Sequence, residues 1–215
     1  MYKLVKSLFF VATIVVLVFT GKIAKATDFE NWTFVGGKTK IMNMEFSFHS
    51  ANFFNGESNY FLNHTQLSLD FPSKGSIYFG IGYKQEYVEF PGRIDWRREY
   101  RPMLHLFYEK NWGYINFRDR HRLEFRFMDG ELINRYRNQV QLAFTKFRGI
   151  TPYFSTEFSF YFNKLDYTRQ RTILGAEIPI KSINLNLFVG HQINEDLPEV
   201  WNNKIMMGTG LSYSF

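Results

Sequence analysis

A two-residue alternation of polar and apolar side chains constrains the fold of this chain more than any other feature. In the stretch NFRDRHRLEFRF (116–127), every second residue is strongly polar, and most of the residues between them are leucine or phenylalanine. Such a period places the two sets of side chains on opposite faces of a β-strand. The phenylalanines would face the core of a soluble β protein, but they would face lipid in a membrane barrel whose lumen holds the arginines. One strand cannot decide between these arrangements.

Similar alternating runs of about 12–15 residues follow one another from residue 39 onward, with turn signals between them. These runs are longer than the roughly 5–6 residues typical of strands in globular proteins. Alternate connections are very short, and most of the others are longer, which is the layout of outer-membrane barrels. The short connections lie at 72–75, 111–113, 148–150 and 180–182. We expect strands at 39–51, 58–71, 76–90, 96–110, 116–127, 132–147, 151–163, 166–179, 183–194 and 203–215.

The expected fold is therefore all-β: a transmembrane, antiparallel, up-and-down β-barrel of about ten strands, with twelve strands as the alternative. The barrel would occupy residues 39–215. Residues 27–38 would form either a periplasmic lead-in segment or a short extra strand.

The first 26 residues have the three parts of a secretory signal peptide. Lys3 and Lys6 form the charged start, residues 8–19 form an apolar run, and AKA at 24–26 is a cleavage site. The apolar run is shorter than the roughly 20 residues that a spanning helix needs. No later stretch is apolar enough for such a helix, so we expect a cleaved signal peptide at 1–26 and membrane insertion by strands.

The chain ends in GLSYSF, in which Leu211, Tyr213 and Phe215 share one face of the last expected strand. An apolar, alternating last strand that ends in phenylalanine resembles the assembly signal of bacterial outer-membrane barrels. We therefore expect periplasmic chaperones and the barrel-assembly machinery to deliver this chain to the outer membrane of a Gram-negative cell. Outer-membrane lipid and lipopolysaccharide would then contact the phenylalanines of 116–127, and the arginines would face the lumen.

The formal net charge of +6 overstates how basic the expected mature protein is. Residues 1–26 hold four lysines and no acidic residue, so the remainder has 22 basic and 20 acidic residues. Nucleic-acid binding requires a concentrated basic face, which this distribution argues against. The absence of cysteine excludes disulfides and thiolate metal sites. With no metal-ligand spacing and no phosphate-binding loop, we expect a monomer with no metal, cofactor or nucleic-acid partner.

Arginines share a strand face with glutamates along much of the chain, which indicates a charged lumen. A planar guanidinium can bind two carboxylates at once, and buried charge is costly unless it is paired. A barrel of about ten strands is only slightly wider than the eight-stranded size that side chains just fill. We therefore expect a network of paired charges that closes the lumen. Its expected members are Glu99, Arg101, Arg118, Arg120, Arg122, Glu124, Arg126, Arg135, Arg137, Arg169 and Arg171.

A non-enzymatic structural or binding role fits such a filled lumen, and surplus arginine would make an anion site within it. Two alternatives stay open. One is a small pore or transporter for anionic solutes, which would leave room between the charged groups. The other is an outer-membrane enzyme that hydrolyses lipid or peptide, which would need a histidine beside a nucleophile or a carboxylate. His121 and His191 would face lipid with no serine or clear acidic partner near them, so no catalytic residue is assigned.

Four stretches follow one another in a familiar order: RDRHRLEFRF (118–127), RYRNQVQLAF (135–144), PYFSTEFSFYF (152–162) and DYTRQRTILGAEIPI (166–180). This order resembles a bacterial outer-membrane barrel family catalogued as domain of unknown function 2490. The resemblance covers most of the expected mature chain and is strongest over 97–192. It implies a barrel in the Gram-negative outer membrane, and it supplies no activity and no catalytic residues.

Overall fold

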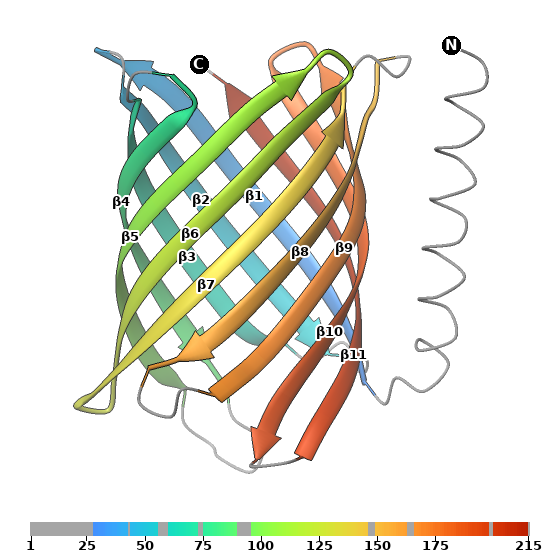
Figure 1. The fold of residues 1–215 in the computed structure, drawn as a ribbon. Coiled ribbons are helices and arrows are strands. Elements are labelled where there is room, and N and C mark those ends of the chain that lie inside the picture. Colours follow the sequence, from blue (N-terminus) through green and yellow to red (C-terminus); the bar gives the residue numbers. More distant parts are fainter. Residues whose placement is uncertain are drawn as a thin grey trace.

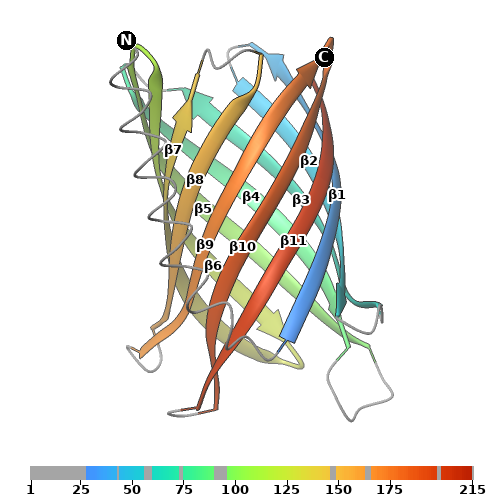
Figure 2. The ribbon, with the colours of Figure 1, turned by 90° about the vertical axis from the view of Figure 1, so that its right-hand side faces the viewer.

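The computed structural model describes residues 28–42, 44–55, 60–72, 75–89, 96–145, 149–162, 166–197 and 200–214. Across these residues, eleven β-strands form one closed barrel (Figures 1 and 2). The expectation of an all-β barrel is therefore confirmed. In the part of the chain described, we find no helix with the length and apolarity needed to cross a membrane. The expected signal peptide (1–26) and Phe215 lie outside the described residues.

The strands are long and follow the chain in order around the barrel. Nine of the eleven have the twelve to fifteen residues expected, one has eleven and one has sixteen. Their bounds are β1 (Asp28–Ile41), β2 (Met44–Asn55), β3 (Tyr60–Pro72), β4 (Ile77–Val88), β5 (Arg97–Trp112), β6 (Ile115–Met128), β7 (Glu131–Phe144), β8 (Thr151–Tyr161), β9 (Asp166–Ile180), β10 (Ile183–Leu197) and β11 (Val200–Ser214).

Each strand pairs antiparallel with the next, and the barrel closes where β1 pairs parallel with β11. Figure 2 shows these two strands side by side. Trp32 lies opposite Gly208 and Phe34 lies opposite Gly210 across this seam. An odd number of strands places the start of β1 and the end of β11 at opposite mouths of the barrel. We call these the N-terminal mouth, where β1 begins, and the C-terminal mouth, where β11 ends.

The strand count differs from the ten or twelve expected, because the segment before residue 39 belongs to a full strand. Residues 28–41 form β1, which is fourteen residues long, so the lead-in interpretation does not describe them. The run expected at 39–51 is divided between β1 and β2. The turn between these strands includes Met42, whose φ of 50° lies in the left-handed region. Neither glycine nor proline marks this turn, so the alternating pattern hides it.

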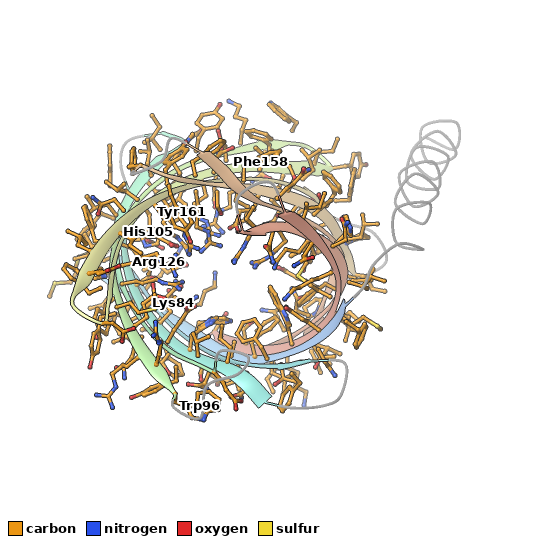
Figure 3. All side chains as sticks on the ribbon, turned by 90° about the horizontal axis from the view of Figure 1, so that it is seen from below. Lys84, Trp96, His105, Arg126, Phe158 and Tyr161 are labelled. Atoms are coloured by element: carbon orange, nitrogen blue, oxygen red, sulfur yellow. The ribbon has the colours of Figure 1, made fainter. Side chains whose placement is uncertain are left out.

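The inner face of the barrel is polar and the outer face is apolar. Along β5, Glu99 and Arg101 are 1% and 5% exposed, whereas Leu104 between the inward positions is 50% exposed. Figure 3 shows Lys84 and Arg126 inside the ring of strands. The arginines of the stretch 116–127 therefore line the lumen, and its phenylalanines lie on the outside.

Candidate functional site

The carboxylate of Glu124, on the inner face of β6, is fully buried. Arg135 donates to it from Nε at 2.8 Å, and Arg137 donates from Nη1 at 2.7 Å. Arg122 lies farther off, with Nη1 3.5 Å from the same carboxylate. The strand register produces this arrangement, because Glu124 lies opposite Arg135, and Arg122 lies opposite Arg137, across β6 and β7.

Two other carboxylates extend this network toward the N-terminal mouth. Glu99 accepts hydrogen bonds from Arg101, with Nη2 at 2.8 Å, and from Arg126, with Nε at 2.5 Å. Glu86 forms ion pairs with Arg101 and with Lys84. Arg101 therefore bridges two carboxylates on neighbouring strands, β4 and β5, as its planar fork allows.

Glu157, on β8, connects the network to β9. Arg137 donates to its Oε1 from Nη2 at 2.6 Å. Arg171 and Arg120 approach the same carboxylate less closely, at 3.7 Å and 3.9 Å. Glu157 is 5% exposed, so it is another buried carboxylate surrounded by guanidinium groups.

These residues form one group, which we call the charge cluster, and in it cations outnumber carboxylates. Its four carboxylates belong to Glu86, Glu99, Glu124 and Glu157. Its eight cations, among the residues described, belong to Lys84, Arg101, Arg120, Arg122, Arg126, Arg135, Arg137 and Arg171. With every group in its ordinary charge state, the charge cluster has an excess of four positive charges.

Neutral amides take up some of the hydrogen bonds of the excess cations. Arg120 donates to the side-chain oxygen of Gln139, and Arg171 donates to Gln192 from Nε at 2.8 Å. Arg169 lies two residues from Arg171 on β9 and donates from Nε to Asn194 at 2.8 Å. An amide oxygen accepts a hydrogen bond but does not neutralise the guanidinium charge.

A second group of inward side chains is aromatic and lies near the seam. Trp32 has its ring centroid 4.6 Å from that of Phe53 and 5.8 Å from that of Phe188. Phe34 stacks on Phe188 with centroids 6.3 Å apart. We call these four residues the aromatic cluster. Arg171 joins the two groups, since its Cζ lies 4.5 Å from the centroid of Trp32.

The structure brings together nine of the eleven residues that the sequence predicted for the lumen network. The exceptions are Arg118, which pairs with Glu109 at 3.0 Å and is more exposed, and Arg169. Strand parity also assigns Lys84, Glu86 and Glu157 to the lumen face, although they were not named among the eleven expected members. The structure adds these three residues to the network.

A polar group also lies on the outer face, against the expectation that His121 has no acidic partner. Its Nε2 lies 3.2 Å from Oδ2 of Asp119, and its Nδ1 lies 2.6 Å from the hydroxyl of Tyr136. Asn138 donates to Oδ1 of Asp119 at 2.6 Å. Asp119 and His121 are two residues apart on β6 and so share a face. We call these four residues the outer polar group.

The described residues contain no group of three or more histidine, aspartate or glutamate side chains able to hold a metal ion. The predicted assembly residues Leu211 and Tyr213 lie on the outer face, 51% and 40% exposed.

Comparison with known proteins gives a family and no activity. No curated protein matches this chain. Residues 29–203 match a family described as a protein of unknown function (DUF2490). This match spans β1 to the first residues of β11, so it includes the charge cluster and the aromatic cluster. The chain therefore belongs to the DUF2490 family, as its arginine-rich strands suggested.

Proposed function

We propose that this protein is an outer-membrane β-barrel with a non-enzymatic binding role, and that its lumen binds a small anion at the charge cluster. The observation that carries the proposal is the presence of eight cations around four carboxylates in the described part of the lumen. Buried charge without a partner is costly, so an excess of this size favours a bound counter-ion.

The chemistry of the excess cations suggests which anions fit. Guanidinium groups present several N–H donors in a plane and bind phosphate or carboxylate through paired hydrogen bonds. Arg120 and Arg171 both approach Glu157 at more than 3.5 Å, so neither forms a close pair with that carboxylate. A phosphate-sized or carboxylate-bearing solute is therefore the expected ligand class.

The outer surface supports the membrane location. Large apolar side chains are exposed on strands all around the barrel, including Phe46, Ile81, Leu104, Leu187 and Leu211. Soluble monomers rarely expose apolar surface on this scale. The strands, which have eleven to sixteen residues, are also long enough for the roughly 9–11 residues that a tilted strand needs to cross the hydrocarbon core.

The binding role is tested by the urea midpoint of unfolding of the barrel in lipid vesicles, with phosphate or chloride at equal ionic strength. An anion that binds only the folded state stabilises it by RT ln(1 + L/Kd), where L is the concentration of the free anion, so the stabilisation increases with that concentration. We expect phosphate to raise the midpoint of the wild type.

Two lumen variants and one outer variant sharpen this test. Arg120→Gln and Arg171→Gln should reduce the phosphate effect, because each removes a cation of the charge cluster. Arg98→Gln is the matched control, since Arg98 is exposed and bonds to Tyr100 on the outer face. Equal urea midpoints of the wild type in phosphate and in chloride would contradict the proposal. An equal reduction of the phosphate effect in all three variants would also contradict it.

A further inference from the structure

We infer that the ligand of the lumen is an amphiphilic anion, in which an apolar or aromatic body carries a phosphate, sulfonate or carboxylate head. This inference rests on the proposed anion-binding role and adds the class of molecule. It comes from the contact between the charge cluster and the aromatic cluster, which meet at Arg171 and Trp32.

Arg171 belongs to both groups. Its Nε and Nη2 donate to Gln192 at 2.8 Å and 2.5 Å, and its Nη1 lies 3.7 Å from Glu157. The same guanidinium lies over the indole of Trp32. A head group bound by Arg171 would therefore have the indole ring as its neighbour.

The two clusters differ in how much of their side-chain surface is exposed to the lumen. The carboxylates of the charge cluster are at most 5% exposed, because cations cover them. Trp32, Phe34 and Phe188 are only half-buried, although they too point inward. The uncovered part of these three rings must face the lumen, so it offers an apolar surface beside the cations.

Two glycines of β11 lie beneath the rings of the aromatic cluster. A Cβ atom at Gly208 would overlap the ring of Phe188, and one at Gly210 would overlap the ring of Phe34. Both glycines are inward positions of β11. The missing side chains let the rings lie close to the strand backbone.

Structural filling alone does not explain the aromatic cluster. The interior of an outer-membrane barrel is ordinarily polar. Elsewhere in this lumen, paired charged side chains occupy the interior. Aromatic rings stack favourably on other rings and pack against apolar bodies. Rings beside an excess of guanidinium groups match a ligand that has one apolar end and one anionic end.

The test measures binding by calorimetry with the barrel in lipid nanodiscs and three soluble probes. Phenyl phosphate carries both features, inorganic phosphate carries only the anion, and phenol carries only the ring. For the wild type we expect phenyl phosphate to bind about tenfold more tightly than inorganic phosphate, the scale of one favourable aromatic contact. We expect phenol to bind far more weakly than phenyl phosphate.

Variants separate the two features of the site. Trp32→Leu should remove the preference for phenyl phosphate over inorganic phosphate, while inorganic phosphate should still bind. Phe34→Leu is a second, smaller change to the same cluster and should reduce the preference in part. Arg171→Gln should weaken both phosphates. Trp112→Leu is the matched control, because Trp112 is 55% exposed on the outer face. A heat-modifiable shift on gels shows which variants have folded.

The outcomes distinguish this inference from the proposed function. Equal affinities for phenyl phosphate and inorganic phosphate contradict the inference that the ligand is amphiphilic, and they leave the proposed anion site in place. The inference is also overturned if Trp112→Leu loses the preference for phenyl phosphate and Trp32→Leu keeps it. Binding of phenol as tight as that of phenyl phosphate overturns it too. If neither phosphate binds the wild type, the proposed function itself fails.

Discussion

Glu124 and Arg135 face each other across β6 and β7, and both are almost completely buried, at 0% and 3% exposed. Arg135 donates to one oxygen of Glu124 from both Nε, at 2.8 Å, and Nη2, at 2.5 Å. Two further arginines reach the other oxygen. This single carboxylate therefore interacts with three guanidinium groups inside the lumen.

Replacing Glu124 with glutamine should destabilise the barrel by about 3–5 kcal/mol, because it leaves buried guanidinium groups without their counter-charge. The urea midpoint in lipid vesicles measures this loss. Glu109→Gln is the control. The side chains of Glu109 and Arg118 are each about one-third exposed, so their ion pair should contribute less than about 1 kcal/mol to stability. Similar losses for the two variants would show that the cluster contributes no more than a surface pair.

The proposed membrane location predicts a cost for charge on the outer face that depends on depth. Leu104 lies near the middle of β5 and is 50% exposed, so Leu104→Arg should destabilise by about 2–4 kcal/mol in a bilayer. Tyr114 lies in the turn after β5, and Tyr114→Arg should cost only about 0–1 kcal/mol. If Leu104→Arg is tolerated as well as Tyr114→Arg, the outer face does not lie in lipid.

The outer polar group should respond to mutation as one unit. Asp119→Leu should destabilise by about 1–3 kcal/mol, because it leaves His121 and Asn138 without their shared acceptor. Changing Asp119, His121 and Asn138 to leucine and Tyr136 to phenylalanine should restore most of that loss, since no polar group of the four is then left unpaired. Unfolding of both variants in vesicles gives the comparison, and additive losses would refute a coupled network.

The parallel seam predicts which residues are reached from the same side of the membrane. The chain has no cysteine, so single cysteines can be labelled without background. Phe29→Cys and Asp129→Cys lie at the N-terminal mouth, and Met42→Cys and Lys181→Cys lie at the C-terminal mouth. An impermeant maleimide on intact cells should label one pair and spare the other. Labelling of Phe29→Cys together with Met42→Cys would contradict an eleven-stranded barrel.

Most of the fold could be predicted from alternation alone, and β1 shows where this signal fails. In β1 the inward positions include Trp32 and Phe34, and the outward positions include Asn31 and Thr33. The usual polarity is reversed at these middle positions, although Glu30 also faces inward and Val35 faces outward. Closure of β1 on β11 joins the two ends of the described chain, for which a local pattern holds no information.

The lumen face could also be predicted, but its pairs could not. Strand parity places Arg137 and Glu157 on the inner face without showing that they meet. Their contact depends on the register of β7 against β8, where Gln139 and not Arg137 lies directly opposite Glu157. Register is set by turn geometry as well as by pattern, so parity predicted the members of the charge cluster better than their partners.

The most direct test of an anion in the lumen is an experimental structure of the protein with selenate, a phosphate-sized anion that anomalous scattering can locate. An anion site at the charge cluster predicts a selenate inside the barrel, within hydrogen-bonding distance of Arg171 or Arg120 and beside Trp32. Occupancy should fall in Arg171→Gln crystals and persist in Arg98→Gln crystals. Selenate found only on the outer surface or at the loops, with the lumen guanidinium groups bound solely to protein and water, would contradict it.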